Sequence, residues 1–374
     1  MSGGKTRPLV RGDMPQVTEL YRSIGEGARS RPVDEVMRKL TECFVDVPFP
    51  DEGAPTSLVH EGSDGRLAGF IGLIPRRWTF HGETIVGLAT TGLVIDPNHP
   101  DTKHTALWLT RDGLGQKQYG FSITDKPTNV VTKMRTGGAG KSTNVVWRSH
   151  VITGHGFRFR IGLRGIEDAR QQLRDRLRWR RYWPLLAPLD RVARRFASAW
   201  DDRHPRSLAS KPKDDLTFEP ATAAAVHETR KALAEAYTPC LVDDPALAKW
   251  QYDFLADYPS RGAFHWYIAR VGGEPVGWFL YYVRVDKPSE VASVVALPRW
   301  KSAVCAAMLD HARRDGATGL IGTTSGVMAH ELIELGATII RADRLLVACR
   351  DEKLLEGFRK TDALITGLES EIWI

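Results

Sequence analysis

The hydrophobic and polar positions of the chain follow two alternating patterns, one typical of helices and one typical of strands. Val17, Leu20, Tyr21 and Ile24 recur at helical spacing, and residues 31–45 carry a second helical pattern. Short apolar runs bounded by glycine, aspartate or proline predict strands. The predicted strands in the first part of the chain span residues 56–60, 67–74, 84–95 and 120–124. This alternation of strands and helices is typical of an α/β fold.

The segment at residues 90–112 reads as a strand that leads through a turn directly into a helix. Leu93, Val94 and Ile95 form a short apolar run, which ends in a turn that contains two prolines. Asp101 or Thr102 is the predicted N-cap of the helix that follows. A helix N-terminus presents unpaired backbone N–H groups and the positive end of the helix dipole. This turn is therefore a candidate site for a ligand that carries phosphate.

The same layout occurs twice along the chain. The strand at residues 65–71, GRLAGFI, recurs as GEPVGWF at residues 273–279, and the strand end at 94–97 recurs at 295–298, again before a helix. Repetition of one unit predicts tandem domains. Residues 364–374 are expected to add a strand or two to one of the sheets. The predicted organisation is a first αβ domain at 1–157, a connector at 158–214 and a second αβ domain at 215–374.

The predicted connector differs in composition from both copies. Residues 158–206 hold fourteen arginines against six acidic residues, and Trp179, Tyr182 and Trp183 lie in the middle beside a short apolar run. Arginines that flank indoles and apolar residues are typical of a helix that lies on a membrane surface. Such a segment is also typical of a solvated basic helix pair that bridges two domains. Both readings of the connector stay open.

Composition agrees with a globular protein that favours anionic partners. The chain has 374 residues, 42% of them hydrophobic, and a net charge of +7 with an isoelectric point near 9.2. Its four cysteines are widely spaced and form no zinc motif, so reduced thiols and a cytoplasmic location are expected. Neither a signal peptide nor an apolar run of membrane-spanning length is recognised. The histidines show no metal-ligand spacing, and no metal site is predicted.

The central turn resembles the acyl-CoA-binding core of the GNAT acyltransferase superfamily. Residues 94–97, VIDP, match the family's Val-x-Pro strand end, and Asn129 matches an asparagine that opens a later helix. Pro100, Lys103 and Thr105 occupy positions at which the family has arginine or glutamine and two glycines. The resemblance implies acetyl-CoA or another acyl-CoA as co-substrate. It also implies an α/β fold with two tandem GNAT-like mixed-sheet αβ domains, here joined by the arginine-rich helical connector.

The resemblance also implies which residues act. An amine would attack the thioester between two parting parallel strands, at residues 89–95 and 121–124, while a carboxylate accepts the amine proton. The residues in reach include Thr90 and Thr91. The predicted catalytic residues are Asp125, Glu83 and Ser122. The predicted residues for acyl-CoA binding are Leu93, Val94, Ile95, Lys103, His104, Thr105 and Asn129. In the second copy, Glu290 and Ser293 lie on the corresponding strand.

The expected activity is transfer of an acyl group from acyl-CoA to the amine of an amino sugar, an amino acid or a peptide, with the cofactor on the first copy. Tandem GNAT-like domains are also the architecture of Fem-type aminoacyl transferases, so aminoacyl transfer from aminoacyl-tRNA is an alternative. Another alternative is a non-catalytic pair that binds an anionic ligand or a partner. The expected location is the cytoplasm, with peripheral contact to anionic membrane at its inner face through residues 158–206.

Overall fold

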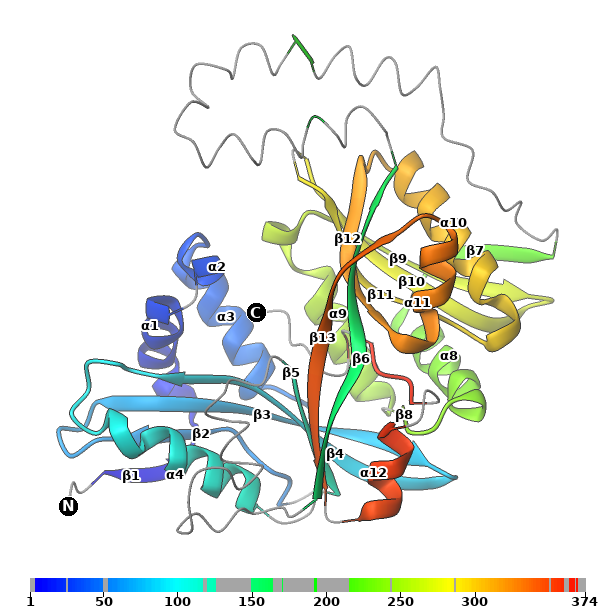
Figure 1. The fold of residues 1–374 in the computed structure, drawn as a ribbon. Helices are drawn as coiled ribbons and strands as arrows, with labels where there is room; N and C mark the ends of the chain where they lie inside the picture. The colour runs from blue at the N-terminus through cyan, green and yellow to red at the C-terminus, as the bar shows by residue number, and fades with distance from the viewer. Residues whose placement is uncertain are drawn as a thin grey trace. The chain divides into compact units, whose positions relative to one another are not determined.

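In the computed structural model, the chain forms two compact units (Figure 1). Unit 1 consists of Met1–His155, Ala234–Phe254 and Asp343–Ile374, and unit 2 consists of Gly156–Leu233 and Leu255–Ala342. The structure describes residues 4–24, 26–49, 53–116, 120–125, 149–163, 170, 192–193, 215–242, 244–285, 287–349, 351–359, 363–366 and 368.

Unit 1 is built on a mixed sheet in which the strand order is β1-β2-β3-β4-β5-β13. Every neighbouring pair is antiparallel except β4 and β5, which run parallel. The strands are β1 (Lys5–Pro8), β2 (Leu58–Glu61), β3 (Leu67–Phe80), β4 (Glu83–Ile95), β5 (Phe121–Asp125) and β13 (Thr338–Cys349). A two-residue strand, β8 (Cys240–Leu241), also pairs with β3.

Helices cover both faces of the unit 1 sheet (Figure 1). Phe44 of α3 packs against Phe70 of β3, with ring centroids 5.0 Å apart. On the other face, Leu109 of α4 packs with Ile71 and Leu73. Alternate residues of a strand point to opposite faces, so β3 separates two apolar layers. The helices are α1 (Met14–Ile24), α2 (Glu26–Arg29), α3 (Val33–Phe44), α4 (Thr102–Gly115), α9 (Pro245–Ala256) and α12 (Glu352–Arg359), and the 3-10 turn η1 (Arg11–Asp13) precedes α1.

Unit 2 has a second mixed sheet, in which the strand order is β6-β12-β11-β10-β9-β7. Here β11 and β12 form the parallel pair, and their neighbours are antiparallel. The strands are β6 (Ser149–Gly162), β7 (Leu216–Pro220), β9 (Ala263–Val271), β10 (Glu274–Val283), β11 (Ser289–Ala296) and β12 (Gly319–Ser325). The helices are α8 (Ala223–Ala236), α10 (Lys301–Arg314) and α11 (Gly326–Glu334), with 3-10 turns η2 (Pro259–Arg261) and η3 (Pro298–Trp300).

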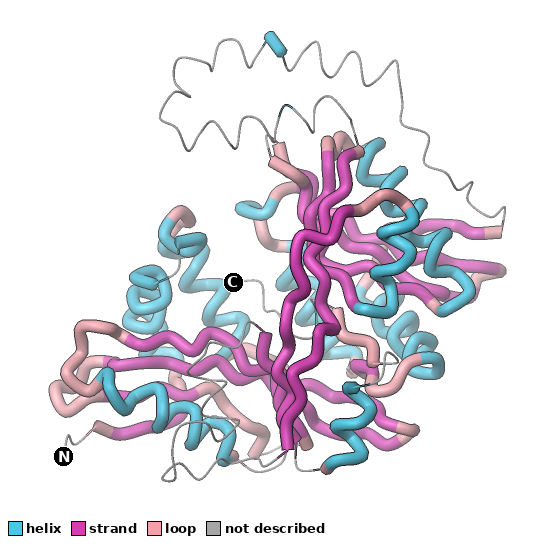
Figure 2. Tube along the Cα trace, viewed as in Figure 1, coloured by secondary structure: helices cyan, strands magenta, loops and turns pink. Residues whose placement is uncertain are grey.

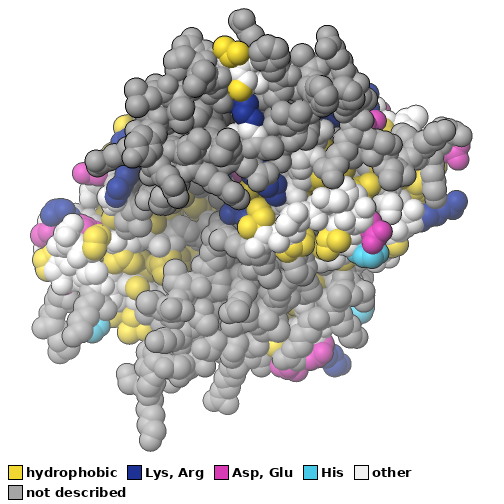
Figure 3. Space-filling view, turned by 45° about the horizontal axis from the view of Figure 1, so that its top comes forward, with side chains coloured by type: hydrophobic (Ala, Val, Ile, Leu, Met, Phe, Trp, Pro, Cys, Tyr) yellow, Lys and Arg dark blue, Asp and Glu magenta, His cyan; other side chains and the backbone are white. Residues whose placement is uncertain are grey.

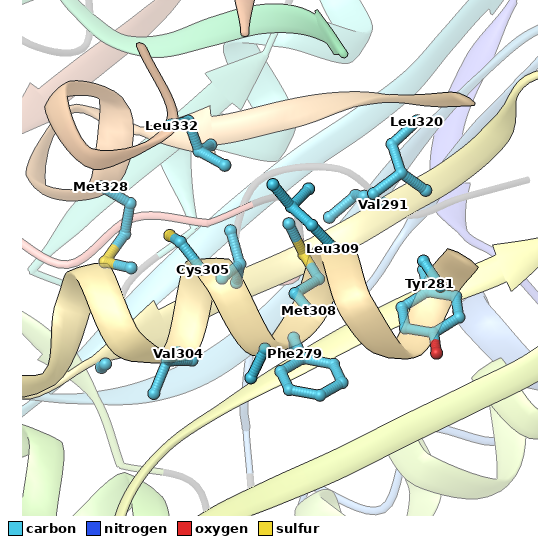
Figure 4. Close-up of a cluster of buried hydrophobic side chains, with 14 of the residues drawn as sticks. Phe279, Tyr281, Val291, Val304, Cys305, Met308, Leu309, Leu320, Met328 and Leu332 are labelled. Carbon is cyan, nitrogen blue, oxygen red and sulfur yellow. The ribbon is translucent and has the colours of Figure 1, made fainter. Parts of the chain in front are cut away.

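The unit 2 core lies between the sheet and helices α10 and α11 (Figure 4). Val304, Met308 and Leu309 of α10 belong to one cluster with Phe279 and Val291 of the sheet, and all five side chains are buried. The two units therefore share one local design. An antiparallel strand pair is followed by a helix and then by a strand parallel to the second of the pair, as β3-β4-α4-β5 and as β10-β11-α10-β12.

Each sheet takes its last strand from the other half of the chain, as the labels β6 and β13 and their colours show in Figure 1; Figure 2 draws both segments as strands. In unit 1, β5 pairs with β13, which comes from the C-terminal part of the sequence. In unit 2, β12 pairs with β6, which precedes residue 163. The sequence-based boundaries, 1–157 and 215–374, assign each domain one continuous segment, whereas each unit consists of segments from both halves.

Several sequence-based elements differ from the structure. The predicted helical connector begins at residue 158, but strand β6 continues to Gly162, so Arg158 and Arg160 lie in a strand. Most of residues 164–214 lie outside the described residues, as does Asn129, which matches the start of a later helix in the resemblance. The predicted C-terminal strand is wrong where the structure describes it, because residues 363–366 are irregular; they nevertheless supply buried side chains at Ala363 and Ile365.

Candidate functional site

In unit 1 the parallel strands β4 and β5 pair over a short stretch and then part. The last paired residues are Ala89 and Ile123. Beyond them β4 continues for six residues to Ile95, whereas β5 ends at Asp125. Two parallel strands that stop pairing leave a V between them, and unpaired backbone groups line its arms. This V lies between the segments that the sequence predicted as the parting strands.

A β-bulge in β4 lies inside the V. Gly72 is opposite Thr91 and Phe70 is opposite Val94, so one extra residue stands in β4 between them. Gly92, in this bulge, has a φ of +65°, a conformation that favours glycine. A bulge leaves backbone groups outside the sheet ladder. Thr91, Gly92 and Leu93 are partly exposed, so these groups can be reached by a ligand.

Residues of the turn from β4 to α4 form hydrogen bonds with one another. The turn starts where the Asp96 N–H donates to the Ala68 carbonyl over 3.0 Å. Within the turn, five backbone N–H groups already have acceptors from the same turn. These are Asn98 to Asp96 Oδ1 at 2.9 Å, His99 to the Asp96 carbonyl at 3.3 Å, Asp101 to His99 Nδ1 at 3.1 Å, Thr102 to the His99 carbonyl at 3.1 Å, and His104 to the Asp101 carbonyl at 3.3 Å. The turn therefore offers fewer backbone donors to a phosphate than the sequence suggested.

Side chains also fill the N-terminus of α4. Asp101 is buried and stands at the N-cap position, although its side chain caps no backbone N–H. His99 is buried beside it and lies 3.2 Å from Asp64, measured from Nε2 to Oδ1. A carboxylate at a helix N-terminus satisfies the positive end of the dipole. A pyrophosphate at this turn would have to compete with Asp101.

A buried histidine lies behind the same helix. His60 packs against Trp108 of α4, with ring centroids 4.7 Å apart, and its Nδ1 lies 3.1 Å from Thr6 Oγ1. Burial lowers the pKa of His60, and the charges of Asp101 and Asp112 only partly oppose this effect. His60 is therefore neutral at pH 7 and adds no positive charge to the turn.

The predicted catalytic residues do not all meet at the V. Glu83 is the first residue of β4 and is exposed at the hairpin opposite Phe80, roughly 20 Å from Ala89 at 3.4 Å per residue. Ser122 is fully buried and pairs with Leu88, before the strands part. Asp125 is the last residue of β5, on the shorter arm of the V. By backbone position, Asp125 thus lies on an arm of the V, whereas Glu83 and Ser122 lie outside the stretch where the strands part.

The predicted acyl-CoA-binding residues are divided between the V and the helix. Leu93 and Ile95 are partly buried against the core on β4, and Val94 is buried. Thr105 is fully buried, and its hydroxyl donates to the Asp101 carbonyl over 2.8 Å. The other two helix residues are in the first turn of α4: Lys103, and His104, which is exposed and packs against the Trp108 ring. Asn129 lies outside the described residues.

Unit 2 repeats the V with two differences. Pairing of β11 with β12 ends at Val291 and Gly322, and a bulge follows at once at Ala292. Residues 291–296 are all buried, so this strand is closed to a ligand where β4 is open. The turn before α10 starts from a matching bond, Leu297 N–H to the Val276 carbonyl at 2.8 Å. That turn has no acidic residue in the first helical turn and carries Arg299 and Lys301.

The bulge residue Gly92 is the part of the site that sequence reasoning missed. Its signal was a glycine inside an apolar strand run, which often marks a bulge or a close approach of backbone. Thr90, the first residue of β4 past the paired stretch, is buried, and its hydroxyl has no hydrogen-bond partner among the described residues. Among the residues that the structure describes, no group of three or more potential metal ligands occurs.

Comparisons with known proteins agree with this geometry at the level of the fold. No protein-family model and no curated protein sequence matches the chain. Solved structures do match. A GCN5-related N-acetyltransferase from Anabaena variabilis has a TM-score of 0.59 at 13% identity, over 92% of this chain and 72% of that one. One from Kribbella flavida has a TM-score of 0.56 at 15% identity, over 94% and 72%.

A protein of unknown function from Enterococcus faecalis V583 also matches, with a TM-score of 0.59 at 10% identity over 95% of this chain and 74% of that one. Identities this low carry information about the fold and none about the substrate. The chain has the fold of the GCN5-related N-acetyltransferases.

Proposed function

We propose that the chain is an N-acyltransferase that moves an acyl group from acyl-CoA to an amine, with the thioester in the V of unit 1. The observation that carries this proposal is the open bulge at Gly92, where β4 has just parted from β5. The corresponding strand of unit 2 is buried, so unit 1 is the better candidate. The acceptor class is the amine of an amino sugar, an amino acid or a peptide.

The bulge supplies the chemistry that acyl transfer needs. When an amine attacks a thioester carbonyl, negative charge develops on the carbonyl oxygen, and a fixed backbone N–H stabilises it. The backbone near Gly92 is outside the sheet ladder and serves as that donor. Asp125, on the other arm of the V, is the proposed acceptor of the amine proton. Collapse of the tetrahedral centre then releases the CoA thiolate and leaves an amide.

The residues of unit 1 fit the acyl end of the cofactor better than its phosphates. The V accepts an extended arm, but the N–H groups of the turn are paired and Asp101 occupies the N-terminus of α4. The phosphates would depend on side chains instead, and Lys103 and His104 in the first turn of α4 are the proposed contacts. Binding of CoA is therefore expected to weaken with increasing salt concentration more steeply than it would if backbone N–H groups held the phosphates.

The same turn favours a second candidate, a GNAT-like pair that binds a ligand without acyl transfer. Paired N–H groups and a buried carboxylate would be an obstacle in an enzyme that must hold a pyrophosphate. They would be harmless in a protein that uses the V to bind another extended ligand. Aminoacyl transfer from tRNA, the remaining alternative, rests on the repeated layout of the two units alone.

Thermal shift with acetyl-CoA, a long-chain acyl-CoA and tRNA separates these candidates, because a ligand of the folded state raises its melting temperature. Acyl-CoA is expected to stabilise the protein, and Lys103→Ala combined with His104→Ala is expected to weaken binding several-fold. Arg299→Ala is the matched control on the unit 2 turn. A loss on Arg299→Ala alone would place the cofactor in unit 2, and no stabilisation by any acyl-CoA would favour the non-catalytic pair.

A further inference from the structure

A second polar cluster lies on the unit 2 sheet, on the face opposite α10. Val291 and Tyr281 point into the core beneath α10 (Figure 4). Their neighbours Glu290 and Tyr282 are directly paired across β11 and β10 and, by strand alternation, point to the other face. The cluster is therefore separate from the α10 turn and from its basic residues.

Arg261 is held rigidly in this cluster. Its Nη1 lies 3.1 Å from Glu290 Oε1, and its guanidinium lies 4.8 Å from the Tyr258 ring centre and 5.7 Å from that of Tyr282. Tyr282 is fixed in turn, because its hydroxyl donates to the Leu255 carbonyl over 2.8 Å. Two aromatic faces and a carboxylate thus orient one arginine before any ligand arrives.

Arg284 shares the same carboxylate. Its Nη1 lies 3.4 Å from Glu290 Oε2, and its Nε donates to the Pro288 carbonyl over 2.9 Å. Burial is the main cause that lowers the pKa of Arg284, with Glu290 opposing it and the like charges of Arg261 and Arg158 adding to it. Glu290 is thus divided between two arginines, each with about a fifth of its side chain exposed.

Arg158 completes the cluster from strand β6. It pairs with Thr323, the first residue of β12 after β11 and β12 stop pairing. Its neighbour Phe159 is in the α10 core, so by strand alternation Arg158 lies on the opposite face, the face that carries Glu290. The Nε of Arg158 is buried and has no hydrogen-bond partner among the described residues. A buried donor without a partner lowers the stability of the folded protein unless a ligand or ion accepts its hydrogen bond.

We propose that Arg158, Arg261 and Arg284 form a binding site for a compact oxyanion, either a phosphate group or a carboxylate. Two guanidinium groups pair with Glu290, and the third, that of Arg158, lies on the same face of the sheet, so these four side chains carry two positive charges in excess. Guanidinium groups offer paired donors that match the oxygens of a phosphate or a carboxylate. Glu290 keeps two of the arginines in place and leaves Arg158 to contact the ligand. This site is independent of acyl transfer in unit 1.

The test is calorimetric titration of the full chain with inorganic phosphate and, separately, with acetate at constant ionic strength. Arg158→Gln and Arg284→Gln are each expected to weaken binding about tenfold, as loss of a charge-assisted hydrogen bond would. Arg314→Gln, an exposed arginine at the end of α10, is the control with the same change in charge and should leave affinity unchanged. Tighter binding of phosphate assigns a phosphate ligand, and tighter binding of acetate assigns a carboxylate.

Folding of the variants is checked by thermal melting without ligand. Arg158→Gln removes no described hydrogen bond, so its melting temperature should match that of the unaltered protein even if Arg284→Gln melts earlier. The proposal is overturned if neither anion binds the unaltered chain. It is equally overturned if Arg158→Gln binds as tightly as the control variant.

Discussion

Gly92 is the residue on which the proposed site depends most directly. Its φ of +65° lies in the left-handed region, which costs other residues about 1–2 kcal/mol. A methyl group there would lie 3.4 Å from the Phe70 ring, which is ordinary contact, so strain and not a clash is the obstacle. Substitution should therefore relax the bulge and displace the backbone N–H groups around it.

We expect Gly92→Ala to lower the free energy of unfolding by about 1 kcal/mol and to lower kcat/KM for acyl transfer by roughly tenfold or more. Gly65→Ala is the matched control, since Gly65 has a φ of +77° in the exposed hairpin turn and has open space around it. Urea unfolding should give both variants a similar loss of stability. Equal transfer rates in the two variants would exclude the bulge from catalysis.

Single residues were predicted from the sequence with uneven success. The strand end at Leu93–Ile95 could be found because apolar residues followed by proline specify it locally. Ser122 and Glu83 could not be placed, since each lies on a correctly predicted strand but outside the part where the strands separate. The point at which the strands separate is set by strand pairing. The sequence of either strand alone does not specify which residues pair.

At the scale of elements, the exchanged strands are the feature that most constrains folding. The unit 1 core combines Trp78 and Phe121 from the first half of the chain with a set from the second half. That set includes Leu241, Val347, Leu354, Leu355 and Phe358, all buried. Burial of each such side chain contributes about 1.5–3 kcal/mol, so together they rival the roughly 5–15 kcal/mol of a typical domain.

We therefore expect fragments 1–214 and 215–374 to be unfolded or aggregated when made separately, and to form a folded complex when produced together. Circular dichroism and co-purification of a tag on one fragment measure this outcome. If residues 1–214 and 215–374 were instead two independent domains, each separate fragment would fold and show its own cooperative melting transition. That result would contradict the assignment of β6 and β13 to the opposite units.

The exchange also marks the limit of sequence reasoning about elements. The layout β3-β4-α4-β5 was predictable, because turn residues and periodicity define each piece and the second copy repeats it. The partner of β6 was not, since residues 149–157 were assigned to the first domain and residues 158–162 read locally as the start of a basic connector. Likewise, Asp101 was correctly placed at the start of α4, but its role as a buried carboxylate depends on His99 and on residues distant in sequence.

At the scale of the whole molecule, the relevant property is the excess of positive charge. The chain carries a net charge of +7, and the described surface shows lysines and arginines interspersed with hydrophobic and acidic side chains (Figure 3). Residues 158–206 alone hold eight more arginines than acidic residues. Within the described residues, no helix combines the length and the apolar character needed to span a membrane.

The arginine-rich segment predicts reversible binding to anionic lipid. At a membrane surface indoles rest at headgroup depth, which is the expectation for Trp179 and Trp183, and each engaged basic residue contributes about 1 kcal/mol near an anionic surface. We expect the protein to sediment with anionic but not with neutral vesicles, and Trp179→Ala combined with Trp183→Ala to reduce the bound fraction. Salt should release it, because the attraction is screened. Protein that stays in the supernatant with anionic vesicles at low salt would show instead that the segment is a solvated basic linker.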